Sequence, residues 1–143
     1  MSARLLISAF IAVLAGLGHG ASLALPWNGQ ASGVLQMLAL ATLAGQLHRV
    51  HRPAHASMLA WLFCTSWLSA TFWWMFVAMH TYAGLAAWMA ALAVGLLAAV
   101  LALYYAIAGY TYAALRPTNP ICAAALFAAL WLLAELARGV WFT

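Results

Sequence analysis

Long apolar stretches alternate with short polar segments along this chain of 143 residues. We expect five of these stretches to form helices, at residues 5–25, 33–50, 58–79, 85–115 and 121–141. A helix rises about 1.5 Å per residue and the hydrocarbon core of a bilayer is about 30 Å thick, so about 20 apolar residues cross it. The second stretch is the weakest, because its clearly apolar part covers only residues 34–47. The pattern predicts an all-α, polytopic membrane bundle of about five transmembrane helices in one domain, 1–143, with no soluble domain.

Composition supports a membrane protein. The chain is 69% hydrophobic and 4% charged, whereas soluble domains carry about 25% charged residues. Its net charge is +4, but the arginines are scattered and form no basic stripe of the kind that nucleic-acid-binding proteins use. We therefore expect no nucleic-acid partner.

The arginines predict an orientation. If five helices alternate across the membrane, one side receives four of them: Arg4, Arg49, Arg52 and Arg116. The positive-inside rule then places the N-terminus in the cytoplasm. Arg4 and the apolar run behind it also fit a cleaved signal peptide. Because the run continues as far as Leu25, we expect a retained spanning helix instead.

Small residues mark two helix faces. Ala12, Gly16 and Gly20 repeat every four residues in the first helix, and Gly95 lies at the centre of a similar face in the fourth. Such faces let helix backbones approach closely in lipid, so partner helices are expected at Gly16, Gly20 and Gly95. His19, beside the first face, is expected to be a packing residue or interfacial anchor.

Aromatic residues concentrate in the third and fourth helices. Trp67 and Thr71 lie in the middle of the third span, which fits either side chains that line a site or large rings that fill the bundle core. Four tyrosines near the end of the fourth helix predict an aromatic girdle at the membrane surface: Tyr104, Tyr105, Tyr110 and Tyr112.

The loops and cysteines offer little chemistry. Pro26, Trp27, Asn28 and Gly29 predict a turn. The second helix ends in His48, Arg49, His51, Arg52, Pro53 and His55, which we interpret as a basic surface loop and not a metal site, because Pro53 interrupts the helical face that two of the histidines would share. Cys64 and Cys122 are expected to be small buried apolar residues. No metal or cofactor is expected.

The last helix carries the only acidic residue, Glu135. Offsets of three and four residues place Trp131, Glu135, Arg138 and Phe142 on one stripe, so the carboxylate and the guanidinium can meet. Charges in lipid usually face a protein interior or a wet cavity. The pair is therefore either a structural contact that neutralises itself or part of a functional site.

Two segments carry a resemblance to a known family. They are AWLFCTSWLSATFWWMFVAMHTYAGL, at residues 60–85, and LWLLAELARGVWFT, at residues 130–143. Together they resemble the membrane region of bacterial apolipoprotein N-acyltransferases, in which the second segment reads E-x-x-R-G, then aromatic residues, then T-G-F-P-W. Glu135, Arg138, Gly139 and Thr143 match this motif, whereas Val140 stands where an aromatic residue is common.

The resemblance implies an enzyme of the bacterial inner membrane that moves a fatty acyl chain from a phospholipid to the N-terminal cysteine amine of a lipoprotein. Family members use a Glu-Lys-Cys triad in a nitrilase-like domain. This chain contains no lysine and a single carboxylate side chain, so neither Cys64 nor Cys122 is expected to be the nucleophile. We expect a truncated, N-terminal part of such an enzyme, inactive alone, with no catalytic residues of its own.

The resemblance also suggests contacts with membrane phospholipid, and with a lipoprotein substrate if a catalytic domain completes the enzyme. The candidates lie at the outer end of the third helix and beside it on the fifth: Trp73, Trp74, His80, Tyr82, Glu135 and Arg138. Packing or anchoring is the alternative for each of them. Two other functions stay open, a small transporter or proton-conducting bundle that uses Glu135, and a structural membrane subunit.

Overall fold

A computed structural model of the chain describes residues 3–25 and 29–142, and the side chains of all of these except Ala3 and Phe142. Every regular element in the described chain is helical: α1 (Ala3–Leu23), α2 (Gly33–Arg49), α3 (Pro53–Thr71), α4 (Trp73–Val77), the π-helical turn η1 (Ala78–Tyr82), α5 (Ala87–Leu101), α6 (Leu103–Leu115) and α7 (Pro120–Phe142). Pro26, Trp27, Asn28 and Thr143 lie outside the described residues. Gly29 has φ +68°, the left-handed conformation that a turn glycine adopts without strain.

The all-α membrane fold is confirmed. Within the described ranges, three helices are long and apolar enough to cross a bilayer: Arg4–Leu23, Ala87–Leu115 and Pro120–Trp141. A fourth span arises if α3 and the α4–η1 segment, which meet at a bend of 52°, cross as one unit. Helix α2, with 17 residues, is shorter than these. The count of five spans and the side of the N-terminus stay predictions.

Local sequence explains where the helices begin. The Ser32 hydroxyl accepts the backbone N–H of Leu35 at 3.4 Å and caps α2. The Asn119 side chain accepts the N–H of Ile121 at 2.9 Å and caps α7. The third helix begins at Pro53 rather than at residue 58 as predicted, because a proline fits the first turn, where its missing N–H needs no partner.

The third helix is also not the straight span of 58–79 that the sequence predicted. It breaks at Phe72, and the segment beyond it turns by 52°. The Thr71 hydroxyl donates to the carbonyl of Trp67 at 3.0 Å, a contact that often bends helices. The π-helical turn η1 follows, closed by the N–H of Ala83 on the carbonyl of Ala78 at 3.1 Å.

The predicted helix 85–115 is present but irregular at Ala102, between α5 and α6. The indole N–H of Trp61 on α3 donates to the carbonyl of Ala99 at 2.9 Å. This bond links α3 to the last turn of α5, immediately before the irregularity.

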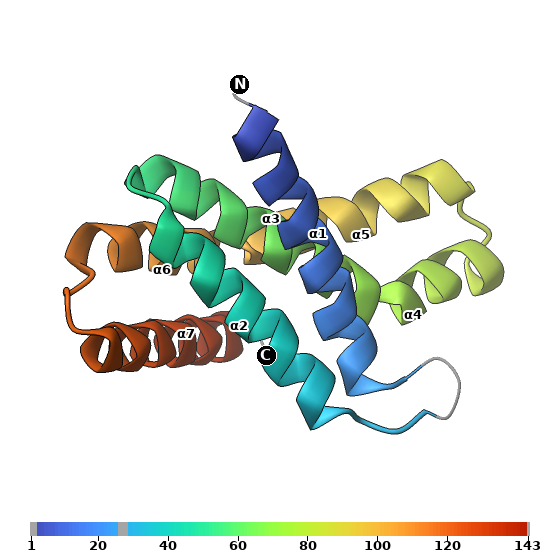
Figure 1. Ribbon diagram of the computed structural model, residues 1–143. Coiled ribbons are helices and arrows are strands. Elements are labelled where there is room, and N and C mark those ends of the chain that lie inside the picture. The colour runs from blue at the N-terminus through green and yellow to red at the C-terminus, as the bar shows by residue number, and fades with distance from the viewer. Residues whose placement is uncertain (1–2, 26–28, 143) are drawn as a thin grey trace.

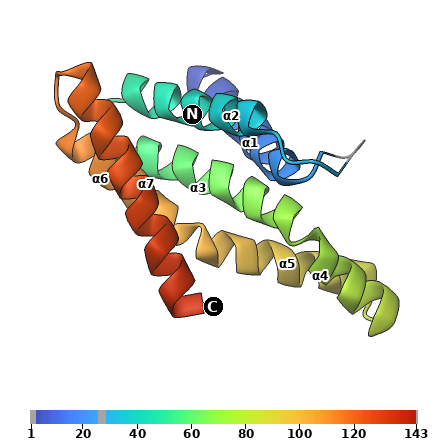
Figure 2. The same ribbon diagram turned by 90° about the horizontal axis from the view of Figure 1, so that it is seen from below.

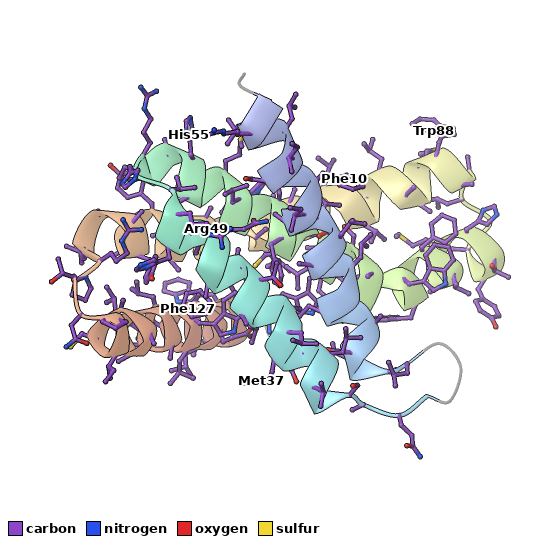
Figure 3. All side chains as sticks on the ribbon, in the orientation of Figure 1. Phe10, Met37, Arg49, His55, Trp88 and Phe127 are labelled. Carbon is purple, nitrogen blue, oxygen red and sulfur yellow. The ribbon has the colours of Figure 1, made fainter. Side chains whose placement is uncertain are left out.

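Helix α3 is the centre of the fold and contacts α1, α2, α5 and α6. Figure 1 shows α1 crossing in front of α3, and in Figure 2 α1 and α2 lie on one side of α3 and α5 on the other. The core holds large side chains from several helices, among them Leu43, Leu59, Phe63 and Tyr105. The outward faces are apolar as well, as a lipid environment requires; Phe10, Met37 and Trp88 point away from the bundle (Figure 3).

Glycines permit the closest helix contacts. A Cβ atom on Gly16 would overlap the backbone carbonyl of Phe63, and one on Gly20 would lie 2.9 Å from the Cβ of Ala70. Both glycines therefore pack against α3 of the same chain. A Cβ atom on Gly95 would meet nothing within 4 Å, so no other part of the described chain packs tightly against this glycine, and a partner there stays a prediction.

Candidate functional site

Three polar side chains from α6 and α7 form a closed hydrogen-bonded cluster, the Tyr105–Glu135–Arg138 cluster. The Tyr105 hydroxyl donates to Glu135 Oε1 at 2.8 Å. Arg138 donates through Nη2 to Glu135 Oε2 at 2.7 Å and through Nε to the Tyr105 hydroxyl oxygen at 3.0 Å. The predicted contact between carboxylate and guanidinium is confirmed, and the tyrosine completes it.

The cluster pairs the two charged side chains of α7 inside an apolar bundle. Tyr105 is 1% exposed, and the side chains of Glu135 and Arg138 are each 28% exposed. Unpaired charges in such surroundings are very costly, whereas a paired carboxylate and guanidinium neutralise each other and satisfy their hydrogen bonds. Both carboxylate oxygens are occupied, so the geometry fixes the carboxylate in place.

Aromatic rings surround the cluster. Trp131 stacks on Trp67 with ring centroids 5.9 Å apart and lies 5.1 Å from the ring of Tyr105. His19 meets the face of Trp67 edge-on at 4.6 Å. His19 is 2% and Trp67 is 7% exposed, so the rings of the third helix fill the bundle core at this point. The expectation that His19 is a packing residue holds.

The cysteines differ from each other, contrary to the sequence prediction. Cys64 is buried in the core, but Cys122 is exposed at the start of α7. Cys122 lies on the outward side of its helix because α7 packs mainly on α6 and leaves most of its surface uncovered. Neither thiol takes part in a hydrogen bond with a basic side chain in the described chain.

The α4–η1 segment presents a second, exposed group of aromatic residues. Trp73, Trp74 and Tyr82 are 59%, 64% and 85% exposed. Trp73 stacks on Phe76 at 4.8 Å, and His80 Nδ1 lies 2.8 Å from the carbonyl of Leu85. Since a carbonyl only accepts, Nδ1 carries the proton, and this bond closes the turn before α5.

The six candidate residues thus fall into two groups. Glu135 and Arg138 meet each other and Tyr105, whereas Trp73, Trp74, His80 and Tyr82 gather on the α4–η1 segment. Both views of the ribbon separate this segment from the C-terminal end of α7 (Figures 1 and 2). The arrangement of all six side by side, expected from a straight third helix, does not occur, because the 52° bend turns α4 away.

Tyr105 and Tyr112 do not lie in the aromatic girdle that the sequence predicts at the membrane surface. Both are buried, at 1% and 3% exposure. The signal was present in the sequence: Tyr105, Gly109 and Tyr112 are separated by four and three residues and so share one helix face. A glycine between two tyrosines on one face fits tight packing, and Gly109 lies against Ala60 of α3.

Comparison with known proteins agrees with this architecture. Residues 19–143 match the family model described as the apolipoprotein N-acyltransferase N-terminal domain. A curated apolipoprotein N-acyltransferase from Verminephrobacter eiseniae is 46% identical over 92% of this chain, and one from Ralstonia nicotianae is 34% identical over 99% of it. The chain covers 25% and 27% of the length of those two relatives. The match over most of its residues shows that the chain belongs to the apolipoprotein N-acyltransferase family, in the part that forms the family's N-terminal domain.

Proposed function

We propose that this chain is the N-terminal membrane part of an apolipoprotein N-acyltransferase and serves as a platform that holds phospholipid, while a separate nitrilase-like domain performs acyl transfer. The observation that carries the platform role is the exposed aromatic surface of the α4–η1 segment. Trp73, Trp74 and Tyr82 leave their rings uncovered at the end of a bent helix, and amphipathic rings favour the boundary between headgroups and acyl chains.

The chain by itself is proposed to be inactive. A thioester route needs an activated thiolate with a base and an oxyanion-stabilising group nearby. Cys64 is enclosed in the core, and Cys122 is exposed on the outer surface of α7. The one carboxylate side chain, Glu135, is held by Arg138 and Tyr105 and is not free to act as a base.

The same geometry supports a structural role for Glu135 over a transporter role. Both of its oxygens are hydrogen-bonded within the cluster, and no observation in the described chain favours a proton path through it.

We place the chain in the bacterial inner membrane with its N-terminus in the cytoplasm, in line with the distribution of arginines. Alkaline phosphatase fusions after residues 25, 50, 83 and 117 test this orientation, and activity after residue 50 would contradict it.

Acyl transfer tests the proposal. The chain is reconstituted with a labelled phospholipid, alone and joined to the C-terminal part of the Verminephrobacter relative. We expect no labelled thioester on the chain alone and transfer to a lipoprotein peptide by the joined protein. Hydroxylamine-sensitive label on Cys64 or Cys122 of the isolated chain would contradict the inactive role.

The platform is tested in the joined protein with two variants. Trp73→Ala/Trp74→Ala should raise the KM for phospholipid several-fold and leave kcat nearly unchanged, because it removes ground-state binding only. Tyr110→Ala, which removes an exposed ring from α6 at 51% exposure, is the control and should change neither constant. Equal effects of the two variants would reject a specific lipid platform at α4–η1.

A further inference from the structure

An open cavity of about 640 Å³ lies where α1 begins, α2 ends and α3 begins. Its basic wall consists of Arg4, Arg49 and Arg52, with His51 and His55 beside them. Arg49 on α2 and His55 on α3 lie at this same end of the molecule, near the start of α1 (Figure 3). The volume is in the range of pockets that bind small molecules, about 300–1,000 Å³.

The three arginines have no counter-charge from the chain itself. Glu135 is the single acidic residue, and its carboxylate is engaged by Arg138 at 2.7 Å. No acidic side chain lines the cavity. Like charges gathered at a membrane surface repel each other and attract anions. An anion that balances the three arginines must therefore come from another molecule.

Arg116 shows what a satisfied arginine looks like in the same region. Its guanidinium donates to the backbone carbonyls of Leu47 and His48 at the end of α2, and it does not line the cavity. It therefore covers the negative end of the α2 helix dipole. Because Arg116 already binds the carbonyls of Leu47 and His48, these two carbonyls are not free to accept hydrogen bonds from the cavity arginines.

Gln46 adds a polar group that also needs a partner. Its side chain lines the cavity, and both of its amide atoms are buried without a hydrogen-bond partner in the described chain. Buried amide groups are nearly always hydrogen-bonded, because leaving them unpaired is costly. The amide atoms are covered in this conformation, so a rotation of the Gln46 side chain toward the cavity would bring them within reach of the oxygens and hydroxyls of a ligand.

The cavity has an apolar wall as well as a basic one. Leu5 and Ile11 of α1 contribute to it, and Ile11 lies about 10 Å further along the helix than Arg4. Ile7 and Phe10 continue the exposed apolar surface of α1, at 59% and 63% exposure. A basic site that opens onto such a surface fits a headgroup with acyl chains attached better than a free phosphate.

We propose that this cavity binds an anionic phospholipid such as phosphatidylglycerol, with its phosphate against the arginines, its glycerol hydroxyls near Gln46 and an acyl chain along α1. The cavity offers no carboxylate to receive the ammonium of an ethanolamine headgroup, so it selects anionic over zwitterionic lipid. The site is independent of the acyl-transfer proposal, because it lies apart from the α4–η1 segment and its test needs no activity.

Lipid retention by the full chain tests the proposal. The detergent-purified protein is mixed with phosphatidylglycerol or phosphatidylethanolamine of matched acyl chains, and bound lipid is counted by native mass spectrometry across a concentration series. We expect phosphatidylglycerol to bind at least about tenfold more tightly. Glycerol 3-phosphate, which carries the charge without acyl chains, should not bind at the same concentrations. Equal binding of the two lipids, or tight binding of glycerol 3-phosphate, would overturn the proposal.

Variants locate the site. Arg49→Gln/Arg52→Gln should weaken phosphatidylglycerol binding roughly 20-fold, since each basic group near a membrane surface contributes a several-fold factor. Arg49→Lys/Arg52→Lys keeps the charge and should retain most of the binding, which shows that the fold tolerates changes at these exposed positions. Arg116→Gln is the control for the loss of one positive charge at this end of the molecule and should have at most a twofold effect on the lipid preference. An equal loss in the Arg116 variant would reduce the effect to general surface charge and would overturn the assigned site.

Discussion

Two groups of aromatic residues in this chain have similar composition and opposite surroundings. In the interior, Trp67, Tyr105 and Trp131 pack ring on ring around a hydrogen-bonded ion pair. On the α4–η1 segment, Trp73, Trp74 and Tyr82 are largely exposed. The first group is part of the core, whereas the second lies on the surface of the molecule. Residue type alone does not distinguish these roles; the bend at Phe72 does, because it turns the second group out of the bundle.

The largest expected difference comes from the same substitution in both groups. Trp67→Ala should lower the free energy of unfolding by about 3 kcal/mol, because it leaves a cavity that the core cannot close. Trp74→Ala should lower it by less than about 0.5 kcal/mol, since an exposed ring makes few contacts. Unfolding in mixed micelles with increasing SDS, followed by circular dichroism, measures both. Similar values for the two variants would remove the distinction between the groups.

A second test addresses the seam that brings α1 against the interior rings. Gly16→Ala places a methyl group against the Phe63 carbonyl, and overpacking of this kind should destabilise the protein by about 2 kcal/mol. Gly95→Ala, where a Cβ meets nothing within 4 Å, should be neutral or slightly stabilising because alanine favours a helix. The same SDS titration measures the free energy of unfolding of both variants. A destabilised Gly95 variant would indicate that another helix or chain covers the α5 face.

The smallest effect is expected from removing a single hydroxyl. Tyr105→Phe keeps the ring stack but deletes the contacts at 2.8 Å and 3.0 Å to Glu135 and Arg138, and should lower the free energy of unfolding by about 1.5 kcal/mol, since both partners are charged. Tyr110→Phe, at a half-exposed position on the same helix, should leave the unfolding free energy unchanged. If Tyr110→Phe destabilises the protein more than Tyr105→Phe does, the hydrogen bonds of the cluster do not stabilise the fold as we infer.

Much of the fold could be predicted from the sequence because the apolar runs are long. The predicted ranges 33–50 and 121–141 agree with α2 and α7 to within one residue at each end, because the apolar runs begin and end close to the helix termini. The break at Phe72 could not be predicted, because no proline or glycine stands there to signal it. The Thr71 hydroxyl donates to the carbonyl of Trp67 at the break, but Thr42 and Thr111 make the same kind of contact inside unbroken helices, so a threonine alone does not signal a bend.

The candidate site also has a part that the sequence predicts and a part that it does not. The Glu135–Arg138 contact followed from spacing on one helix, which is a local property. The third member, Tyr105, is 30 positions away in the sequence, and its position depends on how α6 packs against α7. The basic cavity likewise combines the first turn of α1 with the α2–α3 loop, a juxtaposition that an apolarity pattern does not encode.

The π-helical turn η1 has a consequence for comparing relatives. A turn closed from the N–H of Ala83 to the carbonyl of Ala78 holds one residue more than an α-helical turn. A homologue that closes this turn as a regular α-helix would therefore lack one residue between Val77 and Leu85. An alignment of related chains should show a single-position gap there, and chains with the gap should present the residue equivalent to Tyr82 on a different side of the helix.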